Sequence, residues 1–278
     1  MKQVLIQKAD GASELFRPEK LTQSLKRVGA SDNAVSAILE HIERELEEGT
    51  STSEIYRHAF TLLRKFEQPV AARYSLRRSL AELGPSGFPF EKYIAEIFRA
   101  KGFEILTDQI VQGKCVDHEV DVVAWNENKL IMSEVKFHNE QGFKSDLKIA
   151  LYVKARFDDL LNAEFNYGHR RKLDEGWLVT NTKFTEKAIQ YSACSGVRLI
   201  GWNYPHDGSL QKLIEDADLH PITCLTSLDA GEKRRLMDQG IVLCKGVREN
   251  QMALQEVVVH HDRVKQVIDE SNVLCPVE

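Results

Sequence analysis

The sequence predicts a multi-domain α/β protein, with a mostly helical first segment, a mixed sheet flanked by helices in the middle, and a small helical module at the end. Three observations support this class. Helical periodicity fills most of residues 1–85, strand-like runs alternate with helical segments over 86–205, and the pattern is helical again over 206–278. The stretch Gly84-Pro-Ser-Gly-Phe-Pro89 is rich in Gly and Pro and is the clearest linker in the chain.

For residues 1–85 we predict a short strand over 3–7, a turn at Asp10-Gly11, and helices over 18–28, 31–48, 52–66 and 68–83. Pro18 suits the first turn of its helix, where the missing N–H costs nothing. Ser31 and Thr52 are expected to cap the second and third helices, and Gly49 suits the position just past a helix end.

The middle segment begins with a helix over 90–98 that is ended by Gly102. Strands follow over 103–106, 120–125 and 130–136, and a hairpin-like turn at 126–129 joins the last two. The segment is completed by a helix over 145–161, a strand over 176–180, a helix from 185 to about 194 and a strand over 197–201. This order suits one mixed sheet with helices packed against it.

The last segment, residues 206–278, is predicted to be helical, with breaks at Gly231, Gly240 and Gly246. The stretch from Leu225 to Leu243 weakly resembles a helix-hairpin-helix module but lacks the Gly-x-Gly hairpin with which such modules approach phosphates. Eight Lys and Arg residues stand here against thirteen Asp and Glu residues, which accounts for the net charge of −5 of the whole chain. A packing or oligomerisation module fits this acidity better than a DNA-binding one.

Composition indicates a globular protein without a membrane partner. Hydrophobic residues make up 42% and charged residues 28% of the 278, which is ordinary for a soluble domain. The apolar runs are far too short to cross a bilayer, and the first ten residues reach charge too quickly for a secretory signal. The five cysteines are odd in number and never spaced as CxxC, which favours a reduced, cytoplasmic setting without a zinc site.

Two neighbouring strands of the middle segment carry acids and a lysine that can meet. Asp121 stands in the strand over 120–125, and Glu134 and Lys136 stand two residues apart in the strand over 130–136. Because side chains alternate along a strand, Glu134 and Lys136 point the same way while Val135 packs behind them. Pairing the strands would bring two carboxylates and an ammonium group together. Such a group suits a magnesium ion, and the lysine can orient or deprotonate a water, which is nuclease chemistry.

The middle segment resembles the Mrr-like branch of the PD-(D/E)xK restriction endonuclease superfamily over about residues 86–205. An isolated acid followed by Glu-x-Lys is a weak signal, but here a complete ordered set of pieces is present. These pieces are Phe90-Glu91, Lys101-Gly102-Phe103, Asp121, Glu134-Val135-Lys136, Leu178–Thr185 followed by Ala188 and Tyr191, and Val197–Trp202.

That resemblance implies roles for these residues. Asp121 and Glu134 would hold Mg²⁺ or Mn²⁺, with the carbonyl of Val135 as a further ligand, Lys136 would assist the attacking water, and Glu91 is a candidate accessory acid. His118 and Glu119 are close enough in sequence to support the metal ligands. His138 is expected to end its strand without a catalytic role. His169–Lys172, and more weakly Lys144, Lys148, Lys154 and Arg156, are candidates for contacting phosphates, although charge runs are usually only solvated.

The first segment resembles an ATP-cone domain, which binds ATP or dATP and regulates ribonucleotide reductases and their repressor. The matching pieces are Lys8–Gly11, Phe16, Pro18–Leu21, Thr52–Ile55 and Ala71–Tyr74. The resemblance implies that Lys8, Glu14, Lys20 and Thr52 contact the nucleotide. Lysines and a helix N-terminus suit a polyphosphate, and a hydroxyl and a carboxylate can select base or sugar. The alternative is a degenerate cone that serves only for dimer contacts.

Together these features predict a magnesium-dependent endonuclease of the Mrr-like type IV class that cuts double-stranded DNA under control of ATP or dATP. By the resemblance it would act in defence against foreign or modified DNA. Because cutting both strands takes two sites, we expect a homodimer or higher homo-oligomer. The alternatives are a non-catalytic, nucleotide-responsive DNA-binding regulator and a structure-specific or RNA nuclease. The set of Asp121, Glu134 and Lys136 speaks against the regulator, since a pure binder does not need acids that converge near phosphates.

Overall fold

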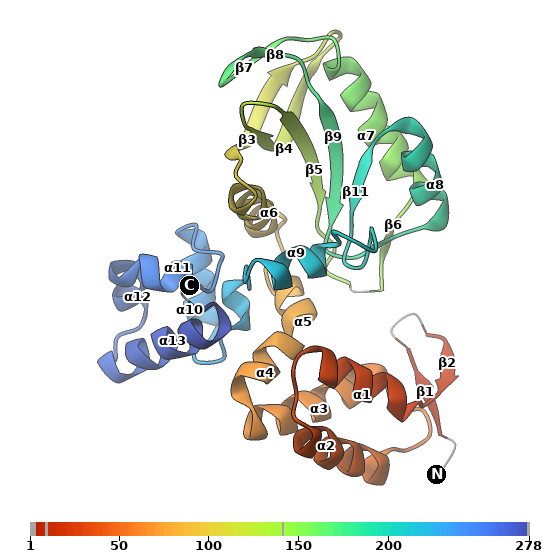
Figure 1. Ribbon diagram of the computed structural model, residues 1–278, viewed down its shortest axis with the longest axis vertical. Coiled ribbons are helices and arrows are strands. Elements are labelled where there is room, and N and C mark those ends of the chain that lie inside the picture. Colours follow the sequence, from red (N-terminus) through yellow and green to blue (C-terminus); the bar gives the residue numbers. More distant parts are fainter. Residues whose placement is uncertain (1–3, 9–10, 141, 277–278) are drawn as a thin grey trace.

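The computed structural model describes residues 4–8, 11–140 and 142–276, which form three regions (Figure 1). A helical N-terminal region and a sheet region lie at opposite ends, and a helical C-terminal region lies beside the middle, where α5 (Leu76–Ala81) and α9 (Leu210–Asp216) are found. Gln3 of the predicted first strand and Asp10 of the predicted turn lie outside the described residues. No helix in the described part of the chain is long and apolar enough to cross a membrane.

The N-terminal region is a short hairpin followed by helices. Strand β1 (Leu5–Gln7) pairs antiparallel with β2 (Ser13–Leu15), which the sequence analysis did not predict. The helices are α1 (Pro18–Arg27), α2 (Asp32–Glu45), α3 (Thr52–Phe66) and α4 (Gln68–Tyr74). Their common core includes Leu25, Ile38 and Leu63, none of which is exposed.

The predicted caps of these helices are half right. Ser31 caps α2 by accepting a hydrogen bond from the Ala34 N–H, as predicted. Thr52 does not cap α3, because Ser51 forms a reciprocal capping box with Glu54 and leaves Thr52 as the first helical residue.

The single helix predicted over 68–83 is in fact two helices. It breaks at Ser75 between α4 and α5. Tyr74 still packs on the N-terminal core, whereas Leu76, Leu80 and Leu83 are buried in a second core with the sheet and the C-terminal helices. The break occurs because the two halves are buried in different cores.

The sheet region contains a mixed sheet, as predicted, with strand order β11-β9-β5-β4-β3 among the described residues. Its first three strands in sequence, β3 (Glu104–Gln112), β4 (Asp117–Trp125) and β5 (Leu130–Lys136), are antiparallel. The strands β9 (Glu175–Thr180) and β11 (Arg198–Ile200) add parallel to β5. Helix α6 (Phe88–Ala100) packs against one face, and α7 (Leu147–Leu160) and α8 (Glu186–Ser195) pack against the other (Figure 1).

Several strands are longer or more numerous than the sequence analysis predicted. β3 runs six residues past its predicted end and β4 begins three residues earlier, because one face of this ribbon is solvated and shows no continuous apolar run. The short parallel pair β6 (Lys144–Ser145) and β10 (Lys183–Phe184), and the hairpin β7 (Phe165–Tyr167) and β8 (His169–Arg171), were not predicted. These pairs carry too few apolar residues to give a strand pattern.

The C-terminal region is helical, as predicted, and comprises α10 (Ala230–Asp238), α11 (Gly246–Glu249), α12 (Gln251–Val257) and α13 (His261–Leu274). Its apolar residues belong to the same core as α5 and α6. The Tyr93 hydroxyl donates to the Leu219 carbonyl (2.6 Å), and the Thr223 hydroxyl donates to the Ser79 carbonyl (2.6 Å). The region is therefore joined to the helices that precede the sheet.

Candidate active site

The register between β4 and β5 brings the two predicted metal-binding acids together. Val122 pairs with Ser133, and one step further along the same antiparallel register Asp121 stands opposite Glu134. Asp121 Oδ2 accepts a hydrogen bond from the Val135 N–H at 2.6 Å. The Val135 peptide therefore lies at the site as well, as the expectation of its carbonyl as a ligand requires.

Glu134 is buried between two cations. Its side chain is 3% exposed, and Lys136 Nζ lies 2.5 Å from its Oε1. Its other oxygen, Oε2, pairs with the guanidinium of Arg156 on α7. Arg156 also donates to the Glu119 carbonyl (2.8 Å) and to the Tyr152 hydroxyl (2.7 Å). A carboxylate this deeply buried requires such partners.

The sequence analysis missed this role of Arg156, which it listed only among weak phosphate contacts. The structure places the residue against a predicted metal ligand instead. One signal was available. Arg156 is adjacent to the apolar positions Val153, Phe157 and Leu160 on the helix that covers the sheet, so its charge needs a buried partner.

Burial, and after it the negative charge of neighbouring acids, raises the pKa of Asp121 and of Glu91. Burial and then the charge of Glu134 raise the pKa of Asp121 to about 6. Burial and then the charges of Asp121, Asp108 and Glu119 raise the pKa of Glu91 to about 7. Glu91, in the first turn of α6, therefore experiences the charges of Asp121 and Lys136.

Lys136 remains positively charged in this site. Burial by itself lowers the pKa of its ammonium group, but the hydrogen bond and the charge of Glu134 outweigh burial and raise that pKa above its usual value. Lys136 is thus a hydrogen-bond donor rather than a proton acceptor at neutral pH.

The end of β5 is fixed to the end of β9 by Asn181. The His138 N–H donates to Asn181 Oδ1, and Asn181 Nδ2 donates to the His138 carbonyl, both at 2.8 Å. The His138 ring lies 3.0 Å from Ser145 Oγ, and burial followed by the charge of Lys136 lowers its pKa. His138 thus holds the end of the strand in place. Asn181 fixes the backbone two residues after Lys136, and it belongs to the Leu178–Thr185 piece of the family resemblance.

Two other groups proposed from the sequence, His118 and the charge run 169–172, contact residues outside the candidate site. His118 Nε2 bonds Asp159 Oδ2 (2.8 Å), and Asp159 also accepts from the Cys115 N–H (2.9 Å), so these residues fix the β3–β4 connection to α7. In the charge run 169–172, Arg170 pairs with Glu164. Arg171 donates to the carbonyls of Asn126 (2.5 Å) and Glu127 (3.0 Å), which holds the β4–β5 turn.

Three of the four predicted nucleotide contacts come together on the N-terminal hairpin and α1. Glu14 lies 2.9 Å from Lys8 Nζ and 3.1 Å from Lys20 Nζ, and these hydrogen bonds lower its pKa. Thr52 lines a cleft of about 820 Å³ between the N-terminal helices and the sheet region, and Lys8, Glu14 and Lys20 are not among its lining residues. Arginines and aromatic residues dominate that cleft: Arg27, Arg73, Arg77, Arg78, Tyr56, Tyr74 and Trp202.

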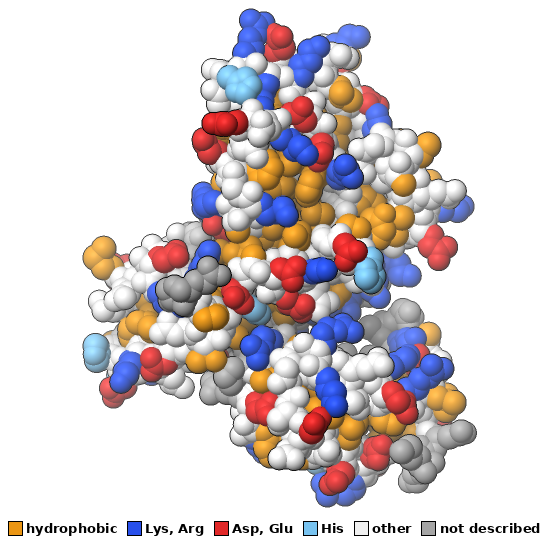
Figure 2. All heavy atoms as spheres, viewed as in Figure 1, with side chains coloured by type: hydrophobic (Ala, Val, Ile, Leu, Met, Phe, Trp, Pro, Cys, Tyr) orange, Lys and Arg blue, Asp and Glu red, His pale blue; other side chains and the backbone are white. Residues whose placement is uncertain are grey.

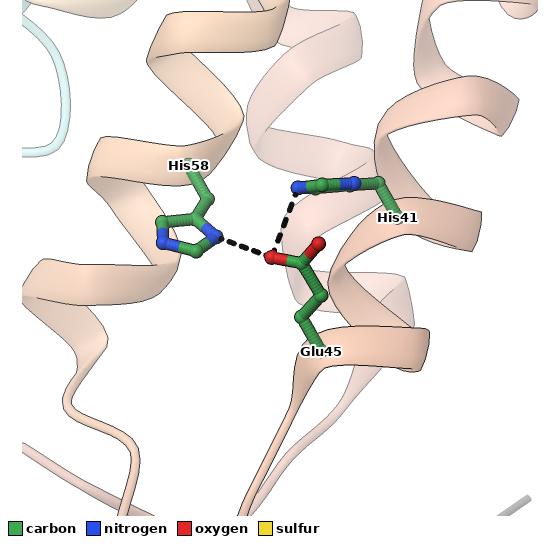
Figure 3. A group of neighbouring side chains, drawn as sticks. All are labelled: His41, Glu45 and His58. Carbon is green, nitrogen blue, oxygen red and sulfur yellow. Dashed lines mark ion pairs between the residues drawn. The ribbon is translucent and has the colours of Figure 1, made fainter.

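A further group with metal-ligand chemistry, His41, Glu45 and His58, lies between α2 and α3 (Figure 3). Both rings face the Glu45 carboxylate, with Oε2 3.3 Å from His41 Nε2 and 3.4 Å from His58 Nδ1. Arg44, always a donor, lies 3.1 Å from His41 Nδ1, so a neutral His41 carries its proton on Nε2 and donates it to Glu45. The group present is a hydrogen-bonded bridge between two helices.

Two family models match parts of the chain. Residues 84–203 match the Mrr_cat model, described as "Restriction endonuclease", and residues 220–275 match the model described as "AF1548-like, C-terminal". The first range contains Glu91, Asp121, Glu134 and Lys136, and neither range includes residues 1–83. The predicted restriction-endonuclease character of the middle segment is thereby confirmed.

Similar proteins have been sequenced and solved. An uncharacterized protein of Archaeoglobus fulgidus (strain ATCC 49558) is 36% identical over 179 residues, which are 64% of this chain and 97% of that protein. The crystal structure of the protein of unknown function AF1548 has 34% identity and a TM-score of 0.56, over 68% of this chain and 98% of that one. The MspJI restriction endonuclease in complex with a 27-mer oligonucleotide has 14% identity over 72% of this chain and 39% of its own, and its TM-score of 0.34 is too low to show a shared fold.

Proposed function

This chain belongs to the AF1548-like family, and we propose that it is a magnesium-dependent endonuclease that hydrolyses phosphodiester bonds of double-stranded DNA. The observation that carries the proposal is the β4–β5 register, which sets Asp121 opposite Glu134 with Lys136 Nζ 2.5 Å from Glu134. The restriction endonuclease match over residues 84–203 includes all three.

Asp121, Glu134 and the Val135 carbonyl would hold Mg²⁺ or Mn²⁺. The donors are all oxygens, as these ions prefer. Burial and then the charge of Glu134 raise the pKa of Asp121, and a cation would offset both effects. Each Glu134 oxygen has a second lone pair beyond the one facing Lys136 or Arg156, so Glu134 can bind a cation and keep both partners. When bound, the ion would supply positive charge that stabilises the phosphate and the leaving oxygen as charge develops.

The other residues would position water and move its proton. The water oxygen adds to phosphorus, one phosphorus–oxygen ester bond breaks, and the departing oxygen ends with a proton. Lys136, as an ammonium group, would donate a hydrogen bond that orients the water or the phosphate oxygen. Glu91, with a pKa of about 7, can take a proton from the water or pass one to the leaving group at neutral pH.

Cleavage of supercoiled plasmid tests this function. With Mg²⁺ or Mn²⁺ the wild type should nick or linearise the DNA, and EDTA should stop it. Glu134→Ala and Lys136→Ala should each lower the rate by about a hundredfold or more, whereas Glu104→Ala, an exposed change at the start of β3, should not. The proposal fails if the wild type cuts neither modified nor unmodified DNA, or if Glu134→Ala cuts as fast as the wild type.

The same assay separates the alternative functions and tests the proposed role in defence. A nucleotide-responsive DNA-binding regulator would bind the plasmid and leave it intact, and an RNA or structure-specific nuclease would cut only RNA or branched substrates. Defence against foreign or modified DNA, part of the proposal through the family resemblance, requires a difference in rate between methylated and unmethylated plasmid. A homodimer, which would serve two strands, should be visible by light scattering.

Regulation by ATP or dATP completes the proposal. A polyphosphate could replace Glu14 as the partner of Lys8 and Lys20. The arginine-rich cleft that Thr52 lines is also bounded by Glu140 and Gly142, in the segment that follows β5 and Lys136. A ligand in that cleft would touch both the N-terminal helices and the segment next to the catalytic strand.

Thermal unfolding with nucleotide tests this regulation. Millimolar ATP or dATP should raise the Tm by a few degrees, since saturation at roughly a hundred times Kd adds about 2.7 kcal/mol. Lys8→Gln with Lys20→Gln, or Thr52→Ala, should reduce the shift, and Lys65→Gln on the exposed side of α3 should not. An unchanged Tm with both nucleotides would remove the regulatory part and leave the nuclease part standing.

A further inference from the structure

A groove of about 780 Å³ lies at the N-terminal ends of α7 and α8, outside the group of Asp121, Glu134 and Lys136. Figure 1 shows the two helices side by side, with β6 at their lower ends. Four lysines line the groove, one from each of four elements: Lys144 of β6, Lys148 of α7, Lys183 of β10 and Lys187 of α8. Its floor is apolar and is formed by Leu147, Leu151, Phe184, Ile189 and Tyr204.

Three of these lysines are poorly neutralised within the described part of the chain. Lys144, Lys148 and Lys187 are exposed and have no acidic partner among the residues that the structure describes. Lys154 further along α7, by contrast, pairs with Asp158. Two acids also line the groove, Asp146, which accepts the Lys148 and Ile149 N–H groups as the cap of α7, and the exposed Glu186. The four lysines outnumber them. The groove thus presents an excess of positive charge to solvent.

The arrangement also places like charges next to each other. Lys144 and Lys183 are register partners in the parallel pair β6–β10, on strands about 4.8 Å apart. Like charges directly opposite each other on paired strands destabilise a sheet. A polyanion laid along the groove would offset this repulsion.

One face of α7 connects the groove to the candidate active site. Lys148, Tyr152 and Arg156 are spaced by four residues and so lie on one stripe of the helix. Arg156 contacts Glu134 and the Tyr152 hydroxyl, and Tyr152 is 58% exposed. From Lys148 to Arg156 the helix rises about 12 Å. At a rise of about 3.4 Å per nucleotide, that distance spans about three to four nucleotides of one strand.

We propose that this four-lysine groove binds the sugar–phosphate backbone of duplex DNA about three to four nucleotides from the phosphate cut at Asp121 and Glu134. The inference rests on the proposed nuclease function and adds the surface that holds the substrate. The lysines contact successive phosphates, and the apolar floor packs against deoxyribose carbons. These contacts are independent of sequence, so they set affinity and position rather than base choice.

The salt dependence of DNA binding tests the groove. A fluorescent duplex of 24 base pairs is titrated with the full-length protein by anisotropy in Ca²⁺, from 50 to 200 mM KCl. The triple variant Lys144→Gln/Lys148→Gln/Lys187→Gln should lower the slope of log K against log salt by about 2.7, which is about 0.9 per lost contact. Over this range the wild type should therefore lose about 40-fold more affinity than the variant.

Two matched variants separate the groove from general charge. Lys65→Gln/Lys101→Gln/Lys265→Gln removes the same charge from exposed positions elsewhere and should keep the wild-type slope. Lys144→Arg/Lys148→Arg/Lys187→Arg keeps the charge in the groove and should bind as the wild type does. In plasmid cleavage the groove triple should raise KM and leave kcat within about twofold.

The outcomes distinguish the groove from the nuclease. If the wild type cuts DNA and the groove triple has an unchanged slope and KM, the proposed DNA-binding groove is wrong and the proposed nuclease function stands. If the wild type never cuts DNA but the groove triple has a reduced slope, the proposed nuclease function is wrong and the groove is supported as a DNA-binding surface. An equal loss in the control triple overturns the groove, because net charge then explains the binding.

Discussion

Asp121 and Glu134 lie opposite each other but share their cations unequally. Glu134 contacts both Lys136 and Arg156, whereas in the described part of the chain the hydrogen bond recorded for Asp121 comes from the Val135 N–H. The carboxylate with less compensation is the one whose pKa is raised to about 6. Glu134 therefore contacts both cations directly, whereas Lys136 and Arg156 act on Asp121 only through their charge.

Asp121→Asn should stabilise the metal-free protein at alkaline pH. The pKa of this carboxyl is raised on folding from 3.8 to about 6. The stability that the protonated carboxyl gives the folded state is therefore fully present below pH 4 and is lost as the pH rises through 6. At pH 8 the variant should have a free energy of unfolding about 2 kcal/mol above the wild type, and the difference should vanish near pH 4. Urea unfolding in EDTA measures this. Asp117→Asn, at an exposed position of the same strand, is the control, and equal stability of Asp121→Asn and wild type at pH 8 would contradict the prediction.

Arg156→Gln should weaken both the fold and the site. It removes one of two cations from a carboxylate that is 3% exposed, and breaking a buried pair on one side costs about 3 kcal/mol. The same substitution made on top of Glu134→Gln should cost much less, because the buried charge is then gone. A double-mutant cycle by urea unfolding measures this coupling, and additive effects of the two changes would show that the pair is unimportant.

At the scale of elements, the ends of β5 and β9 are held together by one side chain. Asn181 is 5% exposed and forms both hydrogen bonds to the His138 backbone. Asn181 directly follows β9, so the backbone just past Lys136 is held by a residue from outside β5, in addition to the pairing of Lys136 with Thr180.

Asn181→Ala should therefore lower plasmid cleavage more than stability alone explains. We expect a loss of about 2 kcal/mol in free energy of unfolding, from two buried hydrogen bonds. Cleavage should fall by roughly tenfold under conditions where the variant is fully folded. Asn166→Ala in the exposed part of the β7–β8 hairpin is the matched control. Unaltered cleavage by folded Asn181→Ala would show that Lys136 is positioned without it.

At the scale of the whole molecule, three cores divide the described chain differently from the sequence segments. One of them lies between the sheet and the helices α7 and α8. The N-terminal core uses residues between 4 and 74, whereas the largest core runs from Leu76 on α5 through α6 to Cys275 near the end of the chain. On the face seen in Figure 2, hydrophobic side chains gather over the middle of the sheet region, and Lys and Arg side chains lie around it and along the junction with the N-terminal helices.

The unfolding of shortened chains should depend on which of these cores they keep. A chain of residues 1–75 should keep a cooperative thermal transition by circular dichroism, since its core is self-contained. A chain that ends at residue 205 should lose that cooperativity in its sheet region and bind a hydrophobic dye, because α5 and α6 lose the C-terminal half of their core. Unfolding of the shortened chain as sharply and at the same temperature as the full one would contradict this.

The strand that carries Glu134 and Lys136 was predictable because it is buried on both faces. Leu130–Lys136 is apolar apart from the residues with chemistry, so its limits, its neighbours and the convergence of Glu134 with Lys136 followed from alternation. The edge strand β3 was predicted too short, and the short pairs β6–β10 and β7–β8 were missed, since solvated or very short strands leave little periodic signal. Thr52 as a cap was wrong because Ser51 competes for the same position and has Glu54 three residues later.

The sequence by itself determined the class of the fold and the chemical groups at the candidate site, because both are local: periodicity specifies elements, and residue type specifies ligands. The tertiary structure decided which further groups meet these residues. Arg156 reaches Glu134 from 22 residues away, Asn181 reaches His138 from 43, and Glu91 joins the site from another helix. Lysines from four separate elements likewise gather in one groove. Such meetings depend on register and packing across the sheet, which a local pattern does not encode.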